Sequence, residues 1–170
     1  MSDRLTQLNQ LSADEAEQEF LKCCGSKRWA QILAAARPFA DASELFSKAD
    51  DLWWSLNETD WLEAFRAHPK IGEKKAATAQ SSQAAAWSAQ EQSGVANASA
   101  DIINQFARRN REYEEKFGFI FIVCATGKSS EEMLAIINER MSNDLQAEVR
   151  IAAEEQNRIT RLRLEKLLNQ

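Results

Sequence analysis

The stretch of sequence that decides the fold class is residues 99–118, SADIINQFARRNREYEEKFG. Its apolar side chains recur at the spacing of one helix face: Ile102, Ile103, Phe106 and Tyr113. Ser99 can cap the first turn, and Gly118 can end the last turn in the left-handed conformation. The stretch therefore predicts one long amphipathic helix with its own start and stop.

Further start and stop signals lie on both sides of this helix. Starts are predicted at side chains that can cap a first turn: Ser12, Ser26, Asp41, Asn57 or Thr59, Ser88, and Ser129 or Ser130. Ser12 with Glu15, and Ser88 with Glu91, have the spacing of a capping box. Stops are predicted at Gly25, near Pro38, at His68 and at Asn143, and a terminal helix runs to Leu168.

Two segments depart from helical periodicity. Residues 70–86 are rich in Gly, Lys, Ser, Gln and Ala and predict a long loop with at most weak helix. Residues 119–124, FIFIVC, predict either a buried extended segment or the start of a buried helix. Because the chain has only five Gly and two Pro, we expect an all-α fold. We expect a single-domain helical bundle of about seven or eight helices over residues 1–170.

Composition excludes several classes of function. The chain has 170 residues, is 44% hydrophobic and 28% charged, and has a formal charge of −5. A negatively charged protein repels phosphate backbones, so we expect no nucleic-acid partner. No segment resembles a signal peptide or approaches the roughly 18 apolar residues of a membrane span. We therefore expect a soluble, unexported protein with no membrane partner.

The cysteines bear on location and on metal binding. Cys23 and Cys24 are adjacent, Cys124 makes the number odd, and their spacing to the single histidine fits no metal site. A reducing cytosol fits this pattern. The last residues, Leu168 to Gln170, are not a peroxisomal signal of the Ser-Lys-Leu type. We expect a cytoplasmic protein with no metal ion.

The chain's one histidine, His68, is the first candidate for chemistry. Histidine is the side chain whose ordinary pKa lies near neutrality. Pro69 restricts His68 to extended backbone geometry, so the imidazole could be held at a pocket rim as a general acid or base. The alternative needs no function, because a histidine at a helix C-terminus interacts favourably with the helix dipole.

Glu91 is the second candidate, and it also has a structural alternative. In a capping box with Ser88, its carboxylate would reach back to the helix N-cap and do nothing else. Gln92 lies beside it. A carboxylate and a carboxamide at a helix start could instead orient a polar ring that carries urea-like groups.

Arginines on the predicted terminal helix are candidates to bind a carboxylate. Counted from Ile159, which we expect to face inward, Arg163 lies one turn further on the same side. Arg161 is displaced by roughly 200° and should face water. An inward guanidinium can hold a carboxylate through two parallel hydrogen bonds. A packed stem with its charged head in water is the alternative for Arg163.

A set of short strings is spread along the chain: AHPKIGEK at 67–74, WS at 87–88, EQSG at 91–94, FGFIFIV at 117–123, RMSN at 140–143, Glu148, and ITRLRL at 159–164. Together they resemble the OHCU decarboxylases, whose substrate is 2-oxo-4-hydroxy-4-carboxy-5-ureidoimidazoline. The resemblance covers nearly the whole chain from Leu8. It implies an all-helical, usually dimeric enzyme that needs no cofactor and makes (S)-allantoin in urate degradation.

The same resemblance assigns roles to individual residues. It implies two catalytic residues, His68 and Glu91, and a substrate-binding set: Pro69, Ser88, Gln92, Phe119, Ile120 and Arg163. Phe119 and Ile120 would contribute backbone groups, and Arg163 would anchor the substrate carboxylate. Arg161 is the alternative anchor. Lys70 stands where many relatives carry arginine, which keeps the charge but not the planar fork.

Two other functions remain as alternatives. The chain could be a non-catalytic helical interaction module in which His68 and Arg163 are structural. It could also be another enzyme on the same fold, such as an isomerase or hydrolase that acts on a ureide. Stereospecific formation of allantoin separates the three, because spontaneous decay of the substrate gives racemic product.

Overall fold

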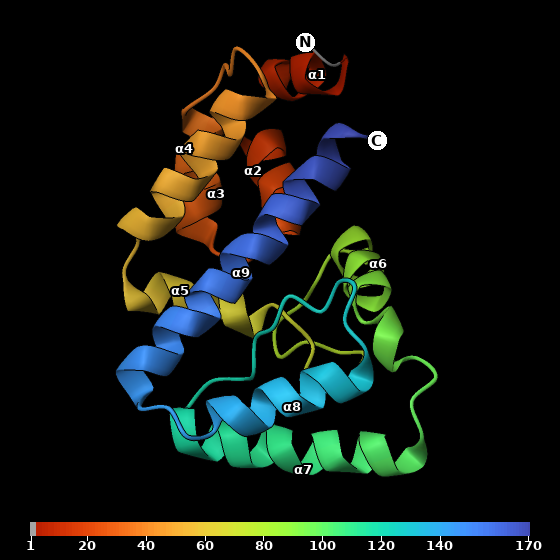
Figure 1. Cartoon of the computed structure of the whole chain (residues 1–170). Helices are drawn as coiled ribbons and strands as arrows, with labels where there is room; N and C mark the ends of the chain where they lie inside the picture. The colour runs from red at the N-terminus through yellow and green to blue at the C-terminus, as the bar shows by residue number, and fades with distance from the viewer. Residues whose placement is uncertain (1–2) are drawn as a thin grey trace. The chain divides into compact units, whose positions relative to one another are not determined.

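The chain is all-helical in the computed structural model, which describes residues 3–170 (Figure 1). Nine α-helices are present in this part of the chain: α1 (Asp3–Gln10), α2 (Ala13–Cys23), α3 (Lys27–Ala35), α4 (Ala42–Ser55), α5 (Glu58–Arg66), α6 (Ser82–Glu91), α7 (Ala100–Phe117), α8 (Ser130–Arg140) and α9 (Leu145–Leu168). A 3₁₀ turn, η1 (Ser93–Val95), follows α6. Among these helices none is both long and apolar enough to cross a membrane.

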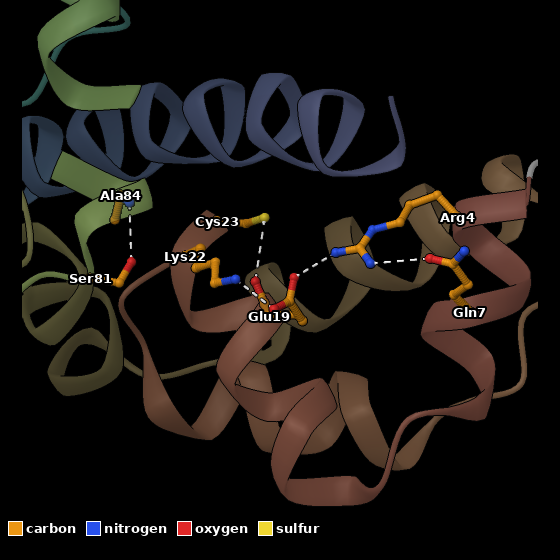
Figure 2. A network of polar contacts seen from close by, with 7 residues as sticks. All are labelled: Arg4, Gln7, Glu19, Lys22, Cys23, Ser81 and Ala84. Atoms are coloured by element: carbon orange, nitrogen blue, oxygen red, sulfur yellow. Dashed lines mark hydrogen bonds and ion pairs between the residues drawn. The ribbon is translucent and has the colours of Figure 1, made fainter. Parts of the chain in front are cut away.

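The all-α class is confirmed, and the expected count of about seven or eight helices is wrong because α1 was not predicted. This helix is short and mostly polar, but Leu5 and Leu8 lie three residues apart on one face and are buried. Arg4 also ties α1 to α2, since its guanidinium lies 2.9 Å from the Glu19 carboxylate (Figure 2). Packing on a neighbour therefore makes a helix that a sequence window does not reveal.

Most predicted helix starts are confirmed at the capping side chain itself. The side chains that accept a backbone N–H from the first turn are Ser12, Ser26, Asp41, Asn57, Ser99 and Ser129. Ser12 and Ser129 form complete capping boxes with Glu15 and Glu132. Gly118 ends α7 with a φ of 79°, a left-handed conformation that favours glycine.

The predicted start at Ser88 is wrong. Helix α6 begins at Ser82, and Ser81 caps it by accepting the N–H of Ala84 at 3.1 Å. Ser88 and Glu91 therefore lie in its last turns. The alanine-rich stretch before Trp87 has high helix propensity, and its apolar side is buried, so the helix forms two turns earlier than the capping pattern suggests. The long loop predicted over 70–86 accordingly ends at Ser81.

Two predicted stops also need small corrections. Helix α5 ends at Arg66, two residues before His68, and α8 ends at Arg140, three residues before Asn143. The N–H of Asn143 then closes a turn on the carbonyl of Arg140 at 3.1 Å. Residues 119–124 are buried and belong to no helix, so of the two alternatives for this run the helix start is wrong.

The described chain divides into two compact units. The first unit comprises residues 3–64 and 157–170, and the second comprises residues 65–156, so α9 contributes to both. An aromatic cluster is central to the first unit: the Phe20 ring meets Trp29 edge-on at 6.2 Å and Phe39 at 6.5 Å. The Trp29 indole also donates to the carbonyl of Ala49 at 3.0 Å. The expectation of one domain over residues 1–170 stays a prediction.

The second unit contains the two longest irregular segments, residues 67–81 and 118–129. Helix α8 packs along α7 in this unit (Figure 1). The Tyr113 ring of α7 contacts the rings of Phe117, Phe119 and Phe121 at centroid distances of 4.6 to 5.9 Å. These aromatic contacts hold the start of the segment 119–125 against α7.

Candidate active site

His68 follows the end of α5 and turns its side chain into the second unit. Its backbone N–H donates to the carbonyl of Phe65 at 3.1 Å, and only 8% of the residue is exposed. Its Nε2 lies 2.7 Å from Oε1 of Gln156, a fully buried side chain on α9. The imidazole is thus enclosed and held by an amide rather than exposed to water at a helix end.

Hydrogen bonds hold both ends of the segment that follows His68, residues 69–80. Pro69 pairs with Ala76 in an isolated antiparallel bridge. Near the far end, Nε2 of Gln80 donates to the carbonyl of Ala67 at 2.7 Å and to Oγ of Ser88 at 3.3 Å. These contacts close residues 67–80 into a loop whose two ends meet beside the histidine.

Two amide side chains hold the middle of the same loop. The backbone N–H of Gly72 donates to Oε1 of Gln92 at 3.1 Å, and Nδ2 of Asn110 donates to the carbonyl of Ile71 at 3.0 Å. Gln92 follows the last residue of α6, whereas Asn110 is buried on α7. Gln92 therefore has a positioning contact to the loop, in addition to the substrate contact that the sequence predicts for it.

Ser88 and Glu91 lie three residues apart on one side of α6, and both are buried, with exposed fractions of 4% and 8%. Their burial near the C-terminus of the helix excludes the capping role considered for Glu91. A carboxylate placed inside a protein is costly unless other groups stabilise it, so such groups concentrate at functional sites. Burial thus favours the functional interpretation of Glu91.

The run 119–125 is held by side chains instead of a neighbouring strand. The N–H of Cys124 donates to Oε2 of Glu155 at 2.7 Å, and the carbonyl of Ile122 accepts from Nη1 of Arg140 at 2.7 Å. Burial raises the pKa of the Cys124 thiol, and the carboxylates of Glu155 and Glu91 raise it further, against the opposite effect of Lys128. The charges of Glu91 and Glu155 therefore both act on this run from different helices.

A buried charged network supports the same run through Arg140, which binds the carbonyl of Ile122. Nε and Nη2 of Arg140 lie 2.6 and 2.5 Å from one carboxylate oxygen of Glu148. Asn143 donates to the other oxygen at 2.9 Å, and the hydroxyl of Tyr113 also donates to this carboxylate. Burial and the Glu148 hydrogen bond raise the pKa of Tyr113. This network gives Glu148 and the RMSN string, through Arg140 and Asn143, a structural role.

Close packing explains the glycine of the EQSG string. A Cβ at Gly94 would lie 2.1 Å from the carbonyl oxygen of Lys128, which is far closer than any real contact. Only glycine lets η1 approach the turn after the 119–125 run at this distance. Lys128 in turn donates its Nζ to the carbonyl of Cys124 at 2.7 Å.

The two candidate arginines of α9 lie in the first unit and differ sharply in environment. Arg163 is 3% exposed, and its Nη1 donates to the carbonyl of Lys22 at 3.3 Å. The side chain of Arg161 is 54% exposed, lies 2.9 Å from Glu165 and stacks over the ring of Phe46. The inward phase predicted for Arg163 and the outward phase predicted for Arg161 are both confirmed.

Metal ligands are not grouped in the described part of the chain. Among residues 3–170, no set of three or more His, Cys, Asp or Glu side chains is arranged to hold a metal ion. The polar groups of the second unit can instead supply a proton-exchanging imidazole, carboxylates, amides and a hydroxyl. Such a set can bind a polar heterocycle and move protons on it.

A protein-family model described as OHCU decarboxylase matches residues 9–165. The chain belongs to this family. The match spans both compact units and includes every candidate residue considered above.

Individual relatives agree with the family assignment. The chain is 38% identical over 160 residues to the uric acid degradation bifunctional protein TTL of Arabidopsis thaliana, covering 94% of the chain but 49% of that protein. It therefore spans only about half of that relative. It is 30% identical over 173 residues to the 2-oxo-4-hydroxy-4-carboxy-5-ureidoimidazoline decarboxylase of Amia calva, covering 96% of the chain and 94% of that protein.

A solved structure of the same family has a similar fold. The crystal structure of an OHCU decarboxylase in the presence of (S)-allantoin is 39% identical to the chain and superposes with a TM-score of 0.78. The match covers 90% of the chain and 99% of that structure. The fold and the family assignment thus agree.

The structure collects most of the predicted site in one unit. The candidates of the second unit are His68, Pro69, Ser88, Glu91, Gln92, Phe119 and Ile120, whereas Arg163 belongs to the first. Sequence reasoning missed Glu155 and Gln156. Helical phase could have found Gln156, because it lies seven residues before Arg163 and therefore on the same face of α9.

Proposed function

We propose that the chain catalyses the decarboxylation of 2-oxo-4-hydroxy-4-carboxy-5-ureidoimidazoline to (S)-allantoin in urate degradation. The observation that carries this proposal is the buried His68 of an OHCU decarboxylase family member, held at 2.7 Å by Gln156. Ser88 and Glu91 are buried in the same unit, although burial of polar groups is costly.

The substrate can accept the electrons of its own decarboxylation. When the bond between C4 and the carboxylate breaks, the electron pair forms a C4=C5 double bond and displaces the electrons of the adjacent ring C=N onto nitrogen. The ring nitrogen takes up a proton, loss of the C4 hydroxyl proton forms a carbonyl, and a proton added to C5 completes allantoin. One carbon dioxide leaves and one proton is taken up, so this route needs no cofactor as an electron sink.

His68 suits the proton transfers of this sequence. A histidine can accept the C4 hydroxyl proton and return a proton near neutral pH. We assign Glu91 to stabilise the charged form of His68 and Arg163 to anchor the substrate carboxylate. Ser88, Gln92, Pro69 and the backbone of Phe119 and Ile120 would fix the ring and its ureido group. Delivery of the proton to one face of C5 would then set the S configuration.

Further properties of the protein follow as proposals from the family. We propose a cytoplasmic homodimer that acts on this small molecule without a cofactor and binds neither nucleic acid nor membrane. The formal charge of −5 supports the absence of a nucleic-acid partner. Size measurement in solution would test the dimer.

Stereospecific turnover is the decisive test. Substrate generated freshly from urate should be converted to (S)-allantoin by the chain, and His68→Asn should lower that rate by about 10²- to 10⁴-fold. Asparagine keeps some hydrogen bonding but cannot exchange protons near neutral pH. Circular dichroism and chiral chromatography would check the fold and the product.

Each alternative predicts a different result in this assay. An interaction module leaves only racemic allantoin, and an isomerase or hydrolase of another ureide leaves the substrate's spontaneous decay unchanged. Near-normal enantioselective turnover by a folded His68→Asn variant would refute the role of His68.

A further inference from the structure

The contact between His68 and Gln156 specifies which ring nitrogen carries the proton. An amide oxygen can only accept a hydrogen bond, so the His68 Nε2 at 2.7 Å from Oε1 of Gln156 must be the donor. In the neutral imidazole, the lone pair then resides on Nδ1. The amide of Gln156 therefore selects one of the two tautomers.

Burial strengthens this selection. Gln156 is fully buried and His68 is 8% exposed, so water is largely excluded from the bond between them. A hydrogen bond is stronger at low dielectric, and an unsatisfied buried acceptor is costly. The tautomer with a proton on Nδ1 would leave the carbonyl oxygen of Gln156 facing a lone pair. The interaction thus favours Nε2–H over Nδ1–H.

The position of Gln156 in the fold makes it a rigid support. It lies in the middle of α9, far from the fraying ends of that helix, and Ala152 and Ala153 one turn earlier are fully buried. The preceding residue, Glu155, binds the N–H of Cys124 at 2.7 Å. Two successive side chains of one helix therefore hold the histidine and the run 119–125.

We infer that Gln156 is a positioning residue that fixes neutral His68 in its Nε2-protonated form, so that Nδ1 accepts the proton of the substrate hydroxyl. This inference deepens the proposed function and rests on it for the identity of the reaction. No covalent step is added: the hydroxyl proton moves to Nδ1 while Nε2–H stays bound to Gln156.

The single histidine makes the tautomer directly measurable. In protein without a tag, labelled with ¹⁵N-histidine, a two-bond ¹H–¹⁵N spectrum contains only the ring of His68. At a pH where the ring is neutral, we expect one tautomer with a protonated Nε2 and an unprotonated Nδ1. A ring protonated on Nδ1 in the wild-type chain would overturn the inference without any variant.

The substitution Gln156→Leu removes the acceptor at similar side-chain size. We expect a mixture of tautomers, a fall in kcat on the order of tenfold, and KM changed by no more than about twofold. Gln146→Leu is the matched control, because Gln146 lies exposed on the same helix and should change neither the spectrum nor kcat. Gln156→Met provides the same test if the leucine variant does not fold.

The positioning role of Gln156 and the proposed function can fail separately. Tautomer populations that stay the same in Gln156→Leu would refute the positioning role even in an active enzyme. A wild-type chain that forms no (S)-allantoin would refute the proposed function, whatever the spectrum of its histidine shows.

Discussion

The two compact units differ in what they bury. Of the twelve buried polar or charged residues in the described chain, the second unit holds nine: His68, Ser88, Glu91, Asn110, Ser130, Arg140, Glu148, Glu155 and Gln156. The first unit holds three: Ser26, Thr160 and Arg163. Its interior is mostly aromatic and aliphatic, and α2, α3, α4 and α5 start at caps that the sequence predicts.

This difference shows what the buried polar groups of the second unit do. Each buried polar side chain opposes folding unless hydrogen bonds offset its lost hydration. Three of these side chains offset the cost of lost hydration by binding backbone groups in segments that form no regular structure: Asn110, Arg140 and Glu155. The second unit thus uses buried polar side chains to fix irregular backbone next to its candidate catalytic residues, whereas in the first unit the side chains with this task, Asn9 and Arg37, are only partly buried.

The largest expected effect tests whether this polar interior maintains the second unit. Arg140→Met should lower the free energy of unfolding by about 3–5 kcal/mol, because it leaves the buried carboxylate of Glu148 without its cation. Urea denaturation would measure the change. The matched control is Arg150→Met: its exposed pair with Glu154 on α9 should contribute less than about 0.5 kcal/mol. Equal effects of the two variants would show that this buried polar interior does not maintain the second unit.

A second effect concerns pH and the first unit. Burial raises the pKa of the Cys24 thiol to about 11 from an ordinary value of 9.0, despite opposing effects of Ser26, Thr160 and Arg163. Between about pH 9 and 11 the unfolded chain therefore releases this proton while the folded chain retains it. This thiol alone should therefore lower the free energy of unfolding by about 3 kcal/mol over this range, and the buried Cys23, whose pKa is raised further, adds to the decline. Cys24→Ala should flatten the decline, and an equally steep decline in that variant would disprove the assignment.

Glu91 provides the next test, because its capping role is excluded. Glu91→Gln should slow turnover by about tenfold to a hundredfold, or about 1.4–2.8 kcal/mol, since an amide cannot stabilise a charged imidazole as a carboxylate does. The melting temperature should change little. Glu154→Gln, on the exposed pair of α9, is the control and should leave the rate unchanged. A rate loss that merely follows lost stability would make Glu91 structural.

The smallest expected effect concerns the one buried arginine of the first unit. Arg163→Lys keeps the charge but loses the planar fork, so it should weaken binding of a carboxylate-bearing substrate analogue by about tenfold. Arg161→Lys should change little, because Arg161 is exposed and paired with Glu165. Calorimetric titration of both variants would test this. The reverse ranking would transfer the anchor to Arg161.

The fold was predictable where a side chain binds the backbone a few residues away. Ser12, Asp41 and Ser99 cap their helices as expected, because a cap is decided within one turn of chain. Helix α1 escaped prediction since its stability comes from packing and from the bond between Arg4 and Glu19. The predicted helix start at Ser88 was wrong because the spacing of Ser88 to Glu91 fits a capping box, whereas Ser81 is the residue that caps α6.

The site was predictable to a smaller degree. Resemblance indicated His68, Ser88 and Glu91, and helical phase separated Arg163 from Arg161. Neither approach indicated Gln156, because its contact with His68 joins residues 88 positions apart in the chain. Helical phase puts Gln156 on the same face of α9 as Arg163, but no local pattern shows that its partner is His68.

The way residues 119–125 are held also bears on solubility. Their sequence, FIFIVCA, is apolar, rich in aromatic and β-branched residues, and free of charge and proline, a composition prone to cross-β assembly. In the folded chain, the backbone groups of Ile122 and Cys124 are occupied by Arg140, Glu155 and Lys128. These side chains take hydrogen-bonding positions that a strand from another molecule would need. Loss of any one of them should therefore make aggregation on heating faster and more dependent on protein concentration.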